Sequence, residues 1–307
     1  MRITNNMLIS NMMNNMNKNL GRLDKTQQQM SSGKKFQLPS DDPIGVSKSL
    51  KYNTDISRIE QYKRNLNDAN SWLEVTESSV AQVGDVLQRT RELVVQSAND
   101  TYSGEDLKQI TKEVEQLKEQ IIKVSNTKFA GRAIFTGYKT DSDLLDSNGN
   151  YLINLDSTEK SRYNVGPSDT VEVNVVGNEL FGLDGGNYGD NVASGNKSKI
   201  VQVFDDIING LNTDNNVDIE NGISDIDDTI ENLLSVRAEI GAKVNRLDLN
   251  NNRLEEQNLT VTKLLSKNED VDMAETIMNL KTQENVYKAS LSAGARVIQP
   301  TLIDFLR

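Results

Sequence analysis

Carboxylates and lysines are the side chains with which this 307-residue chain could do chemistry, because it contains neither histidine nor cysteine. A Ser-His-Asp triad, an imidazole acid or base, a thiolate nucleophile and a metal bound by Cys or His are therefore excluded. An enzyme built from this chain would depend on carboxylates, lysine, tyrosine or a metal held by oxygen ligands.

One acidic cluster has the residue types of a calcium loop. Asp141, Asp143, Asp146 and Asn148 follow one another at short spacing. An EF-hand loop needs glycine at its sixth position and glutamate at its twelfth, whereas loops starting at Asp141 or Asp143 have Asp146 or Asn148 at the sixth. We therefore interpret the cluster as a solvated hairpin, and we expect no metal and no cofactor.

Two other motifs also favour a structural interpretation. The glycine-rich segment 185–189 is not followed by Lys-Ser/Thr, so it does not match a phosphate-binding loop. Glu113, Glu115 and Glu119 are interpreted as a solvated helix face rather than as an acid/base pair. We expect the chain not to be an enzyme.

Charge and hydropathy exclude further classes of protein. The formal net charge is −11, which disfavours nucleic-acid binding because that needs concentrated positive charge. The chain contains no apolar run of about 18 residues, so we expect no membrane span. The first twenty residues lack a continuous apolar stretch, so we expect no cleaved signal peptide.

The apolar residues indicate long helices. They recur with alternating steps of three and four, as in a heptad repeat, in the segments 9–30, 59–94, 107–124, 219–265 and 273–298. A helix over 44–99 would be about 84 Å long, whereas a compact globule of this size has a radius of gyration of only about 19 Å. The helical part is therefore predicted to be elongated.

The middle of the chain has a different composition. Ten of the nineteen glycines lie between Gly131 and Gly195. Asn148-Gly149 predicts a type I′ hairpin turn, the alternation over 170–176 predicts a strand, and 199–211 reads as a helix. The insert is acidic, with a net charge of −8 over residues 141–192, which favours a solvated outer surface.

The predicted fold class is mainly α with a small β-rich insert. It is an elongated rod of long antiparallel helices or coiled coil, with the N- and C-termini paired. We divide the chain into a terminal coiled-coil domain (1–42 and 263–307), a helical-bundle domain (43–136 and 212–262) and a β-rich outer domain (137–211).

The ends of the chain have an unusual composition. All eight methionines lie within the first 30 residues or between residues 273 and 278, and the first nineteen residues hold seven asparagines, which are poor helix formers. Residues 1–40 carry a net charge of +5. Such a segment is predicted to be marginal alone and to become helical on contact. The alternative is an ordinary intramolecular coiled coil between the two ends.

Several motifs carry a resemblance to a known family. Residues 30–35 (MSSGKK) with 39–45 (PSDDPIG), residues 87–99 (LQRTRELVVQSAN), and residues 272–277 with 298–306 resemble sequences of the bacterial flagellin superfamily. The resemblance covers roughly 1–140 and 215–307. Pro39, Pro43 and the segment 131–137 are similar to the hook–filament junction branch, although Ala133 replaces its usual aromatic residue.

The resemblance implies a structural subunit of the bacterial flagellum that forms the junction between hook and filament. Its expected partners are hook-associated protein 1, flagellin, further copies of itself in a junction ring, and an export chaperone with the type III export apparatus. The expected location is extracellular, without a cleaved signal peptide. The alternative is flagellin itself, the bulk filament subunit.

Two groups of site residues follow from the resemblance and the repeats. Arg89, Arg91 and Glu92 are expected on a surface between subunits, the alternative being ordinary intrachain ion pairs. The predicted assembly interface comprises heptad residues of both ends, namely Ile9, Met13, Met16, Leu20, Leu23, Met30, Ile277, Leu280, Tyr287, Leu291, Ile298, Leu302 and Phe305.

Overall fold

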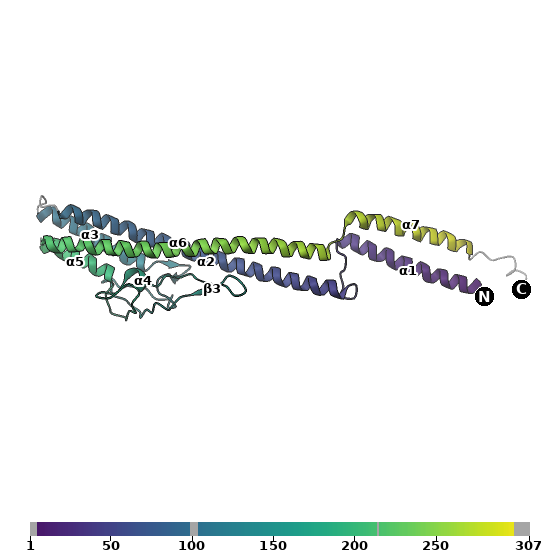
Figure 1. Cartoon of the computed structure of the whole chain (residues 1–307), viewed down its shortest axis with the longest axis horizontal. Helices are drawn as coiled ribbons and strands as arrows, with labels where there is room; N and C mark the ends of the chain where they lie inside the picture. Colours follow the sequence, from purple (N-terminus) through teal and green to yellow (C-terminus); the bar gives the residue numbers. More distant parts are fainter. Residues whose placement is uncertain (1–4, 99–103, 214, 298–307) are drawn as a thin grey trace, which may run out of the picture. The chain divides into compact units, whose positions relative to one another are not determined.

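The computed structural model of the protein describes residues 5–98, 104–213 and 215–297, and it is mainly helical (Figure 1). The chain divides into two compact units. Unit 1 comprises residues 1–58 and 256–307, and unit 2 comprises residues 59–255. None of the described helices is long and apolar enough to cross a membrane.

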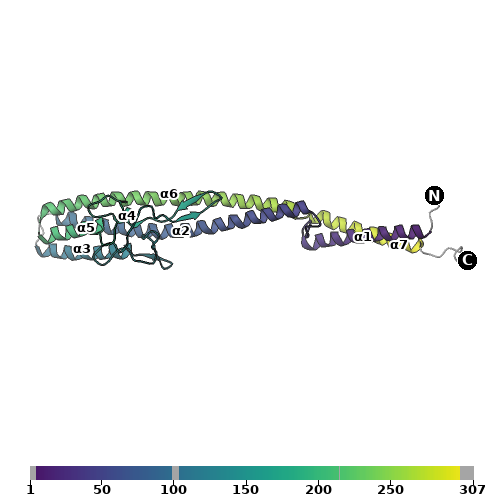
Figure 2. The ribbon, with the colours of Figure 1, turned by 90° about the horizontal axis from the view of Figure 1, so that it is seen from below.

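Two long helices run through unit 2, as the heptad repeats predict. They are α2 (Pro43–Ser97) and α6 (Asn216–Glu269), and in this unit they lie antiparallel, side by side (Figures 1 and 2). Three ion pairs join them along their length, namely Lys63–Glu255 at 3.1 Å, Arg237–Glu77 at 2.7 Å and Arg91–Asp227 at 2.6 Å. The shorter helices α3 (Gly104–Ser125) and α5 (Lys199–Thr213) complete the bundle.

The core of unit 2 confirms the predicted pattern. In α2, ten of the eleven heptad residues between Ile59 and Val94 are buried, and the remaining one, Tyr62, is half-buried. Leu73, Val80 and Leu87 have no exposed surface. Each buried aliphatic side chain contributes about 1.5–3 kcal/mol, so this row supplies much of the stability of the bundle.

The motif at the start of α2 has a physical cause. Asp42 caps the helix, because its Oδ1 accepts hydrogen bonds from the backbone N–H groups of Ile44 at 3.1 Å and Gly45 at 3.0 Å. Pro43 occupies the first helical position, where no N–H is needed. A Cβ at Gly45 would lie 2.6 Å from the ring of Phe36, so the glycine allows Phe36 to close over the helix start.

The insert has less β-structure than predicted. It contains an antiparallel pair of strands, β3 (Arg162–Asn164) with β4 (Thr170–Glu172). A second antiparallel pair, β1 (Lys128–Phe129) with β2 (Arg132–Ala133), directly precedes the insert. The strand predicted over 170–176 ends at Glu172. Beyond it Val173 N–H still donates to Ser161 O at 3.1 Å, and the buried Asn174 side chain then accepts from Ser161 N–H at 2.7 Å and donates to Glu159 O at 2.8 Å.

The predicted type I′ turn at Asn148-Gly149 is wrong. That turn needs positive φ at both residues, and of the two only Gly149 has it, at +82°. The Asp146 side chain organises a longer loop instead, because its Oδ1 accepts from the backbone N–H groups of Asn148 at 2.9 Å and Asn150 at 2.8 Å. The sequence did not reveal this competing aspartate cap.

The insert nevertheless has a core of its own. The fully buried rings of Phe135 and Phe181, the latter on α4 (Gly177–Phe181), meet edge to face at 5.5 Å between centroids. The buried hydroxyl of Tyr151 donates a hydrogen bond to Gly182 O at 2.6 Å. These contacts form the interior of the irregular segment and satisfy the buried hydroxyl of Tyr151.

One carboxylate joins α3 to α5. Asp205 accepts from Lys118 Nζ at 2.6 Å and also pairs with Lys197. Burial opposes its charged form, but the hydrogen bonds from the two lysines outweigh burial and hold the pKa of Asp205 below its ordinary value. The neighbouring Asp206 behaves oppositely, because burial, and then the charges of Asp184 and Asp225, raise its pKa.

Asp205→Asn is therefore expected to destabilise the chain in a pH-dependent way. Because the folded-state pKa of Asp205 is depressed, its stabilisation is complete above the unfolded value of about 3.9 and is lost as the pH falls through the folded-state pKa. Denaturation from pH 7 to pH 2 should show a loss of about 1–2 kcal/mol at pH 7 that vanishes in acid. Asp206→Asn is the control, and an equal loss there would contradict the assignment.

Candidate assembly interface

The two ends of the described chain form a helical pair in unit 1. Helix α1 (Asn5–Ser32) lies beside α7 (Met273–Val297), and the two run antiparallel (Figures 1 and 2). The side-chain amide of Asn19 donates to Ser290 Oγ at 3.2 Å, and a Cβ at Gly294 would lie 2.7 Å from Met12 Cε. These two contacts define the faces with which the helices meet.

The inner face of α1 holds only part of the predicted interface. Of the predicted residues, Ile9, Met16, Leu23 and Met30 are half-buried. Between them, the inner positions are taken by Met12, Asn19 and Thr26, which are also half-buried. The heptad repeat favours Leu20 over its neighbour Asn19 because Leu20 is apolar. Thr26 lies between the polar residues Lys25 and Gln27, so no apolar residue marks that position of the repeat.

Met13 and Leu20 instead lie on an outer face of α1. They are 43% and 46% exposed, although they are the apolar choices at their heptad positions. The helix thus turns an asparagine inward and a leucine outward. In a helix that only packs against α7, the opposite arrangement would bury more apolar surface.

Helix α7 has the same organisation. Its inner face includes the predicted residues Leu280, which is buried, and Tyr287, which is half-buried. The predicted Ile277 and Leu291 are 47% and 44% exposed. The remaining predicted residues, Ile298, Leu302 and Phe305, lie outside the described residues.

The two outer rows lie on the same side of the pair. Met13 and Leu20 each follow an inner residue of α1 by one position, and Ile277 and Leu291 each follow an inner residue of α7 by one position. Because the helices are right-handed and antiparallel, these equal offsets turn toward one common side. Because Asn19 binds Ser290, Leu291 lies at a height along the helix axis between Met13 and Leu20.

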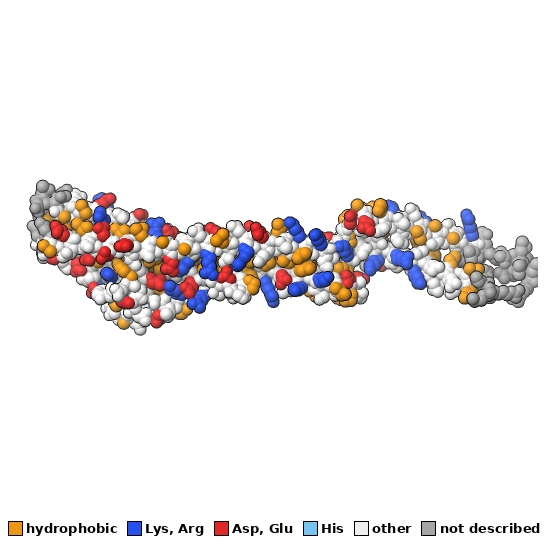
Figure 3. All heavy atoms as spheres, in the orientation of Figure 1, with side chains coloured by type: hydrophobic (Ala, Val, Ile, Leu, Met, Phe, Trp, Pro, Cys, Tyr) orange, Lys and Arg blue, Asp and Glu red, His pale blue; other side chains and the backbone are white. Residues whose placement is uncertain are grey.

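Met13, Leu20 and Leu291 therefore form one patch, here called the outer patch. In Figure 3, hydrophobic side chains reach the surface at several places along α1 and α7. Methionine is unbranched and flexible, so it adapts to an irregular partner surface. The patch is suited to helix–helix packing rather than to catalysis.

The predicted residues on α2 have intrachain partners. Arg89 Nη2 lies 2.8 Å from Glu113 Oε1, and Arg89 Nη1 lies 3.2 Å from Glu92 Oε2. The hydrogen bonds to Glu113, and secondly to Glu92, raise the pKa of Arg89. Arg91 binds Asp227 with two nitrogens, at 2.6 and 3.3 Å. All these side chains are 43–69% exposed, so a neighbouring subunit could still contact them.

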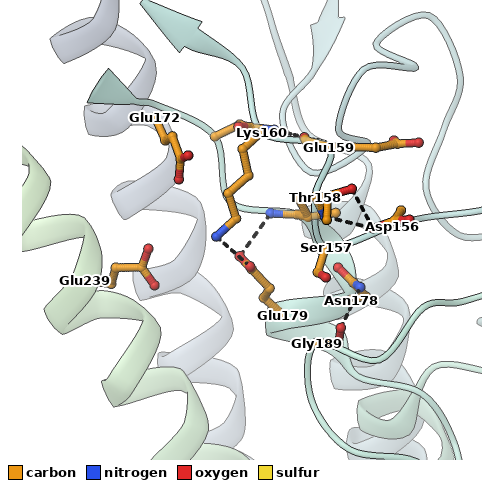
Figure 4. Close-up of polar contacts among 12 residues, drawn as sticks. Asp156, Ser157, Thr158, Glu159, Lys160, Glu172, Asn178, Glu179, Gly189 and Glu239 are labelled. Carbon is orange, nitrogen blue, oxygen red and sulfur yellow. Dashed lines mark hydrogen bonds and ion pairs between the residues drawn. The ribbon is translucent and has the colours of Figure 1, made fainter. Parts of the chain in front are cut away.

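A cluster of charged side chains lies where the insert approaches α6. In Figure 4 the ammonium of Lys160 points toward Glu179, with Glu239 and Glu172 nearby, and the Lys160–Glu179 distance is 2.9 Å. Burial disfavours the charge on Lys160, but the hydrogen bond with Glu179 and the three carboxylate charges raise its pKa. The amine stays protonated and lacks the lone pair of a nucleophile. The insert is joined to α6 by the ion pairs of Asp169 with Arg246 at 2.6 Å and with Arg253 at 3.4 Å.

The acidic cluster weighed as a calcium loop has other partners. Asp143 lies 2.8 Å from Lys128, and Asp146 caps the loop described above. Within the described ranges, no group of three or more acidic side chains is arranged to hold a metal ion.

Comparison with known proteins gives two family matches. Residues 3–140 match the N-terminal helical region of bacterial flagellin, and residues 223–306 match the C-terminal helical region of bacterial flagellin. The two matches include α1 and α7 with all residues of the outer patch, and the segment between them includes most of the insert.

Relatives match over nearly the whole chain. The chain is 26% identical over 306 residues to flagellar hook-associated protein 3 of Escherichia coli, which covers 95% of this chain and 96% of the relative. It is 26% identical to flagellin of Bacillus subtilis, covering 97% of each. Among solved structures, a putative flagellar hook-associated protein of Vibrio parahaemolyticus superposes with a TM-score of 0.65 at 25% identity, covering 75% of this chain and all of the other.

Proposed function

The chain belongs to the bacterial flagellin family, and on that basis we propose that it is a structural subunit forming the junction between hook and filament. It acts by helical polymer assembly through its terminal helices. One observation carries the proposal, namely that α1 and α7 expose leucines beside inward asparagine and serine side chains. Such helices need further helices to cover their outer patch.

The mechanism is packing without catalysis. Subunits associate when the outer patch of one copy meets a helical pair of its neighbour, which removes Met13, Leu20 and Leu291 from water. Ile277, with the predicted residues Ile298, Leu302 and Phe305, extends the interface along the pair. Arg89, Arg91 and Glu92 form a second, polar contact surface on unit 2.

The proposed partners follow from the position of a junction. Hook-associated protein 1 lies on the hook side, flagellin on the filament side, and further copies of this chain complete a ring between them. An export chaperone and the flagellar type III apparatus deliver the subunit to the extracellular flagellum without a cleaved signal peptide. The curated relatives that carry the name hook-associated protein 3 support this choice.

Flagellin itself is the second candidate, favoured by the match to the Bacillus subtilis flagellin over 97% of each chain. Labelling distinguishes the two. An epitope tag in the exposed loop at Asn148, detected by immunogold microscopy on purified flagella, should appear only at the base of each filament. Label along the whole filament would instead identify the bulk subunit.

Deleting residues 1–20 is expected to leave unit 2 folded and to prevent assembly. The deletion removes Met13 and Leu20 together with the partner of Ser290, whereas the core of unit 2 lies within residues 59–255. Circular dichroism should show a cooperative helical transition, while cells producing only the truncated chain should build no filament. Motile cells with normal filaments would contradict the role of the terminal helices.

A further inference from the structure

The pairing of α1 with α7 is weak along its length. Of the α1 side chains that the structure describes, none is fully buried. Between the described side chains of α1 and α7, the direct polar contact is the Asn19–Ser290 hydrogen bond, and no ion pair joins them. Two helices held mainly by half-buried side chains and by one direct polar contact are marginal in water, because helix nucleation is costly.

The strongest contacts of unit 1 lie where these helices end. Residues 33–35, which follow α1, bind residues 267–271, which comprise the last residues of α6 and the start of its connection to α7. We call these two segments the clasp. Lys35 N–H donates to Glu269 O at 2.6 Å, and Val271 N–H donates to Gly33 O at 3.0 Å. The Lys34 ammonium lies 2.7 Å from the Glu269 carboxylate, whose side chain is only 11% exposed.

The clasp is also bound to the neighbouring helix ends. The side-chain amide of Asn268 donates to Gly45 O at 2.8 Å and to Ser49 Oγ at 2.7 Å, both on α2. Asp272 caps α7 directly after the clasp, accepting from the N–H groups of Ala274 at 2.9 Å and Glu275 at 3.2 Å. The ends of α1, α2, α6 and α7 therefore meet in one hydrogen-bonded group.

We propose that the clasp is the nucleus from which the α1/α7 pair forms, and that it sets the register of the two helices. The segments that pair are more than 200 residues apart in sequence, so bringing them together costs chain entropy. The contacts of the clasp offset this entropy cost at one end of the helix pair, where α1 ends and α7 begins. Pairing then extends from the clasp toward residues 5 and 297, and it opens in the reverse order.

The register follows from the same contacts. With Gly33 bonded to Val271 and Lys35 bonded to Glu269, α1 and α7 leave the clasp at fixed positions. Asn19 then reaches Ser290 and leaves Leu20 outside. A shift of one residue would place Leu20 inward and bury the outer patch within its own chain. The clasp thereby preserves an exposed surface that the isolated pair would otherwise bury.

Amide hydrogen exchange of the full-length monomer, followed by mass spectrometry, tests this order of events. Protection in α1 should decrease from residue 32 toward residue 7, and protection in α7 should decrease from residue 275 toward residue 296. Uniform protection, or protection that increases away from the clasp, would overturn the proposal. Assembly is not needed for this measurement, so its result does not depend on the proposed function.

Charge reversal tests the clasp itself. Glu269→Lys places a third ammonium beside Lys34 and Lys35, and it should speed exchange throughout α1 and α7 by about tenfold. The double variant Lys34→Glu with Glu269→Lys should recover most of the protection. Lys281→Glu is the matched control, because Lys281 pairs with Glu284 on the exposed side of α7, at 3.0 Å, and it should change exchange by less than about twofold.

Three outcomes of this experiment would overturn the proposal. In the first, Glu269→Lys affects only the amides of the clasp. In the second, the double variant exchanges as fast as the single one. In the third, exchange also rises across residues 59–255, which would mean that Glu269 supports the whole fold rather than the terminal pair.

Discussion

Replacing Leu20 and Leu291 by lysine is expected to abolish polymerisation and to leave the monomer folded. Both side chains are more than 40% exposed in the single chain, so the exchange leaves no cavity behind. A polymer buries the exposed remainder of each leucine, which contributes about 1 kcal/mol, and each lysine would bring an unpaired charge into the contact. Sedimentation should therefore show a loss of association of at least about 100-fold.

Lysines at polar positions of the same helices provide the control. Asn17 and Asn279 are exposed and do not belong to the outer patch. The variant Asn17→Lys with Asn279→Lys carries the same number of added lysines. It should still polymerise, and only the salt concentration needed for polymerisation should rise modestly. If both double variants failed to assemble equally, net charge rather than the outer patch would control association.

The second large effect is expected in the core of unit 2. Leu73 of α2 has no exposed surface, and Leu73→Ala should lower the free energy of unfolding by about 2–5 kcal/mol. The matched control is Leu249→Ala on α6, where the leucine is 70% exposed and the loss should stay within about 0.5 kcal/mol. Urea denaturation, monitored by the fluorescence of the single Trp72, measures both variants.

A small effect at Leu73 would contradict the assignment of the heptad row as the core of the bundle. The chain has two compact units, so a single unfolding free energy is meaningful only where the transition is two-state. Trp72 belongs to unit 2, and its fluorescence therefore follows the unit that carries both substitutions.

The long helices could be predicted from the sequence because a heptad repeat that continues over many turns fits a helix and does not fit a strand or a loop. The ten-step alternation from Ile59 to Val94 has a polar entry at Thr76 and another at Thr90, and both are buried because each hydroxyl bonds to the carbonyl four residues earlier. The helix considered over residues 44–99 agrees closely with the bounds of α2. Asp42 and Pro43 have local roles at the helix start, whereas Gly45 is needed because the ring of Phe36 packs against it.

The insert could not be predicted in the same detail, because its structure depends on distant partners. Asn174 ends a strand by bonding residues 159 and 161, and Asp146 replaces the expected turn by capping two N–H groups. The alternation of residues 170–176 alone does not indicate that Asn174 binds residues 159 and 161. Short polar side chains compete with neighbouring strands for the backbone N–H and C=O groups, and the surrounding fold determines which of the two forms the hydrogen bonds.

The candidate interface was predicted as a set of residues, whereas its division into two faces depended on the register. A heptad assignment cannot tell whether Asn19 or Leu20 faces the partner helix, since both fit the repeat within one position. The bond between Asn19 and Ser290 decides the matter in the structure. The three-domain division remains a prediction, as does the contact surface at Arg89, Arg91 and Glu92.

The exposed leucines of α1 and α7 also make the subunit sensitive to its own abundance. Anything that binds the folded form adds to its stability in proportion to the logarithm of its concentration, and here the binding partner is another subunit. Dilute chains should lose the terminal helix pair first, at temperatures where unit 2 persists. Above a threshold concentration, contacts with neighbouring subunits should restore the pair. The end of a growing polymer would then order α1 and α7 of each incoming subunit, although the same helices are unpaired in dilute solution.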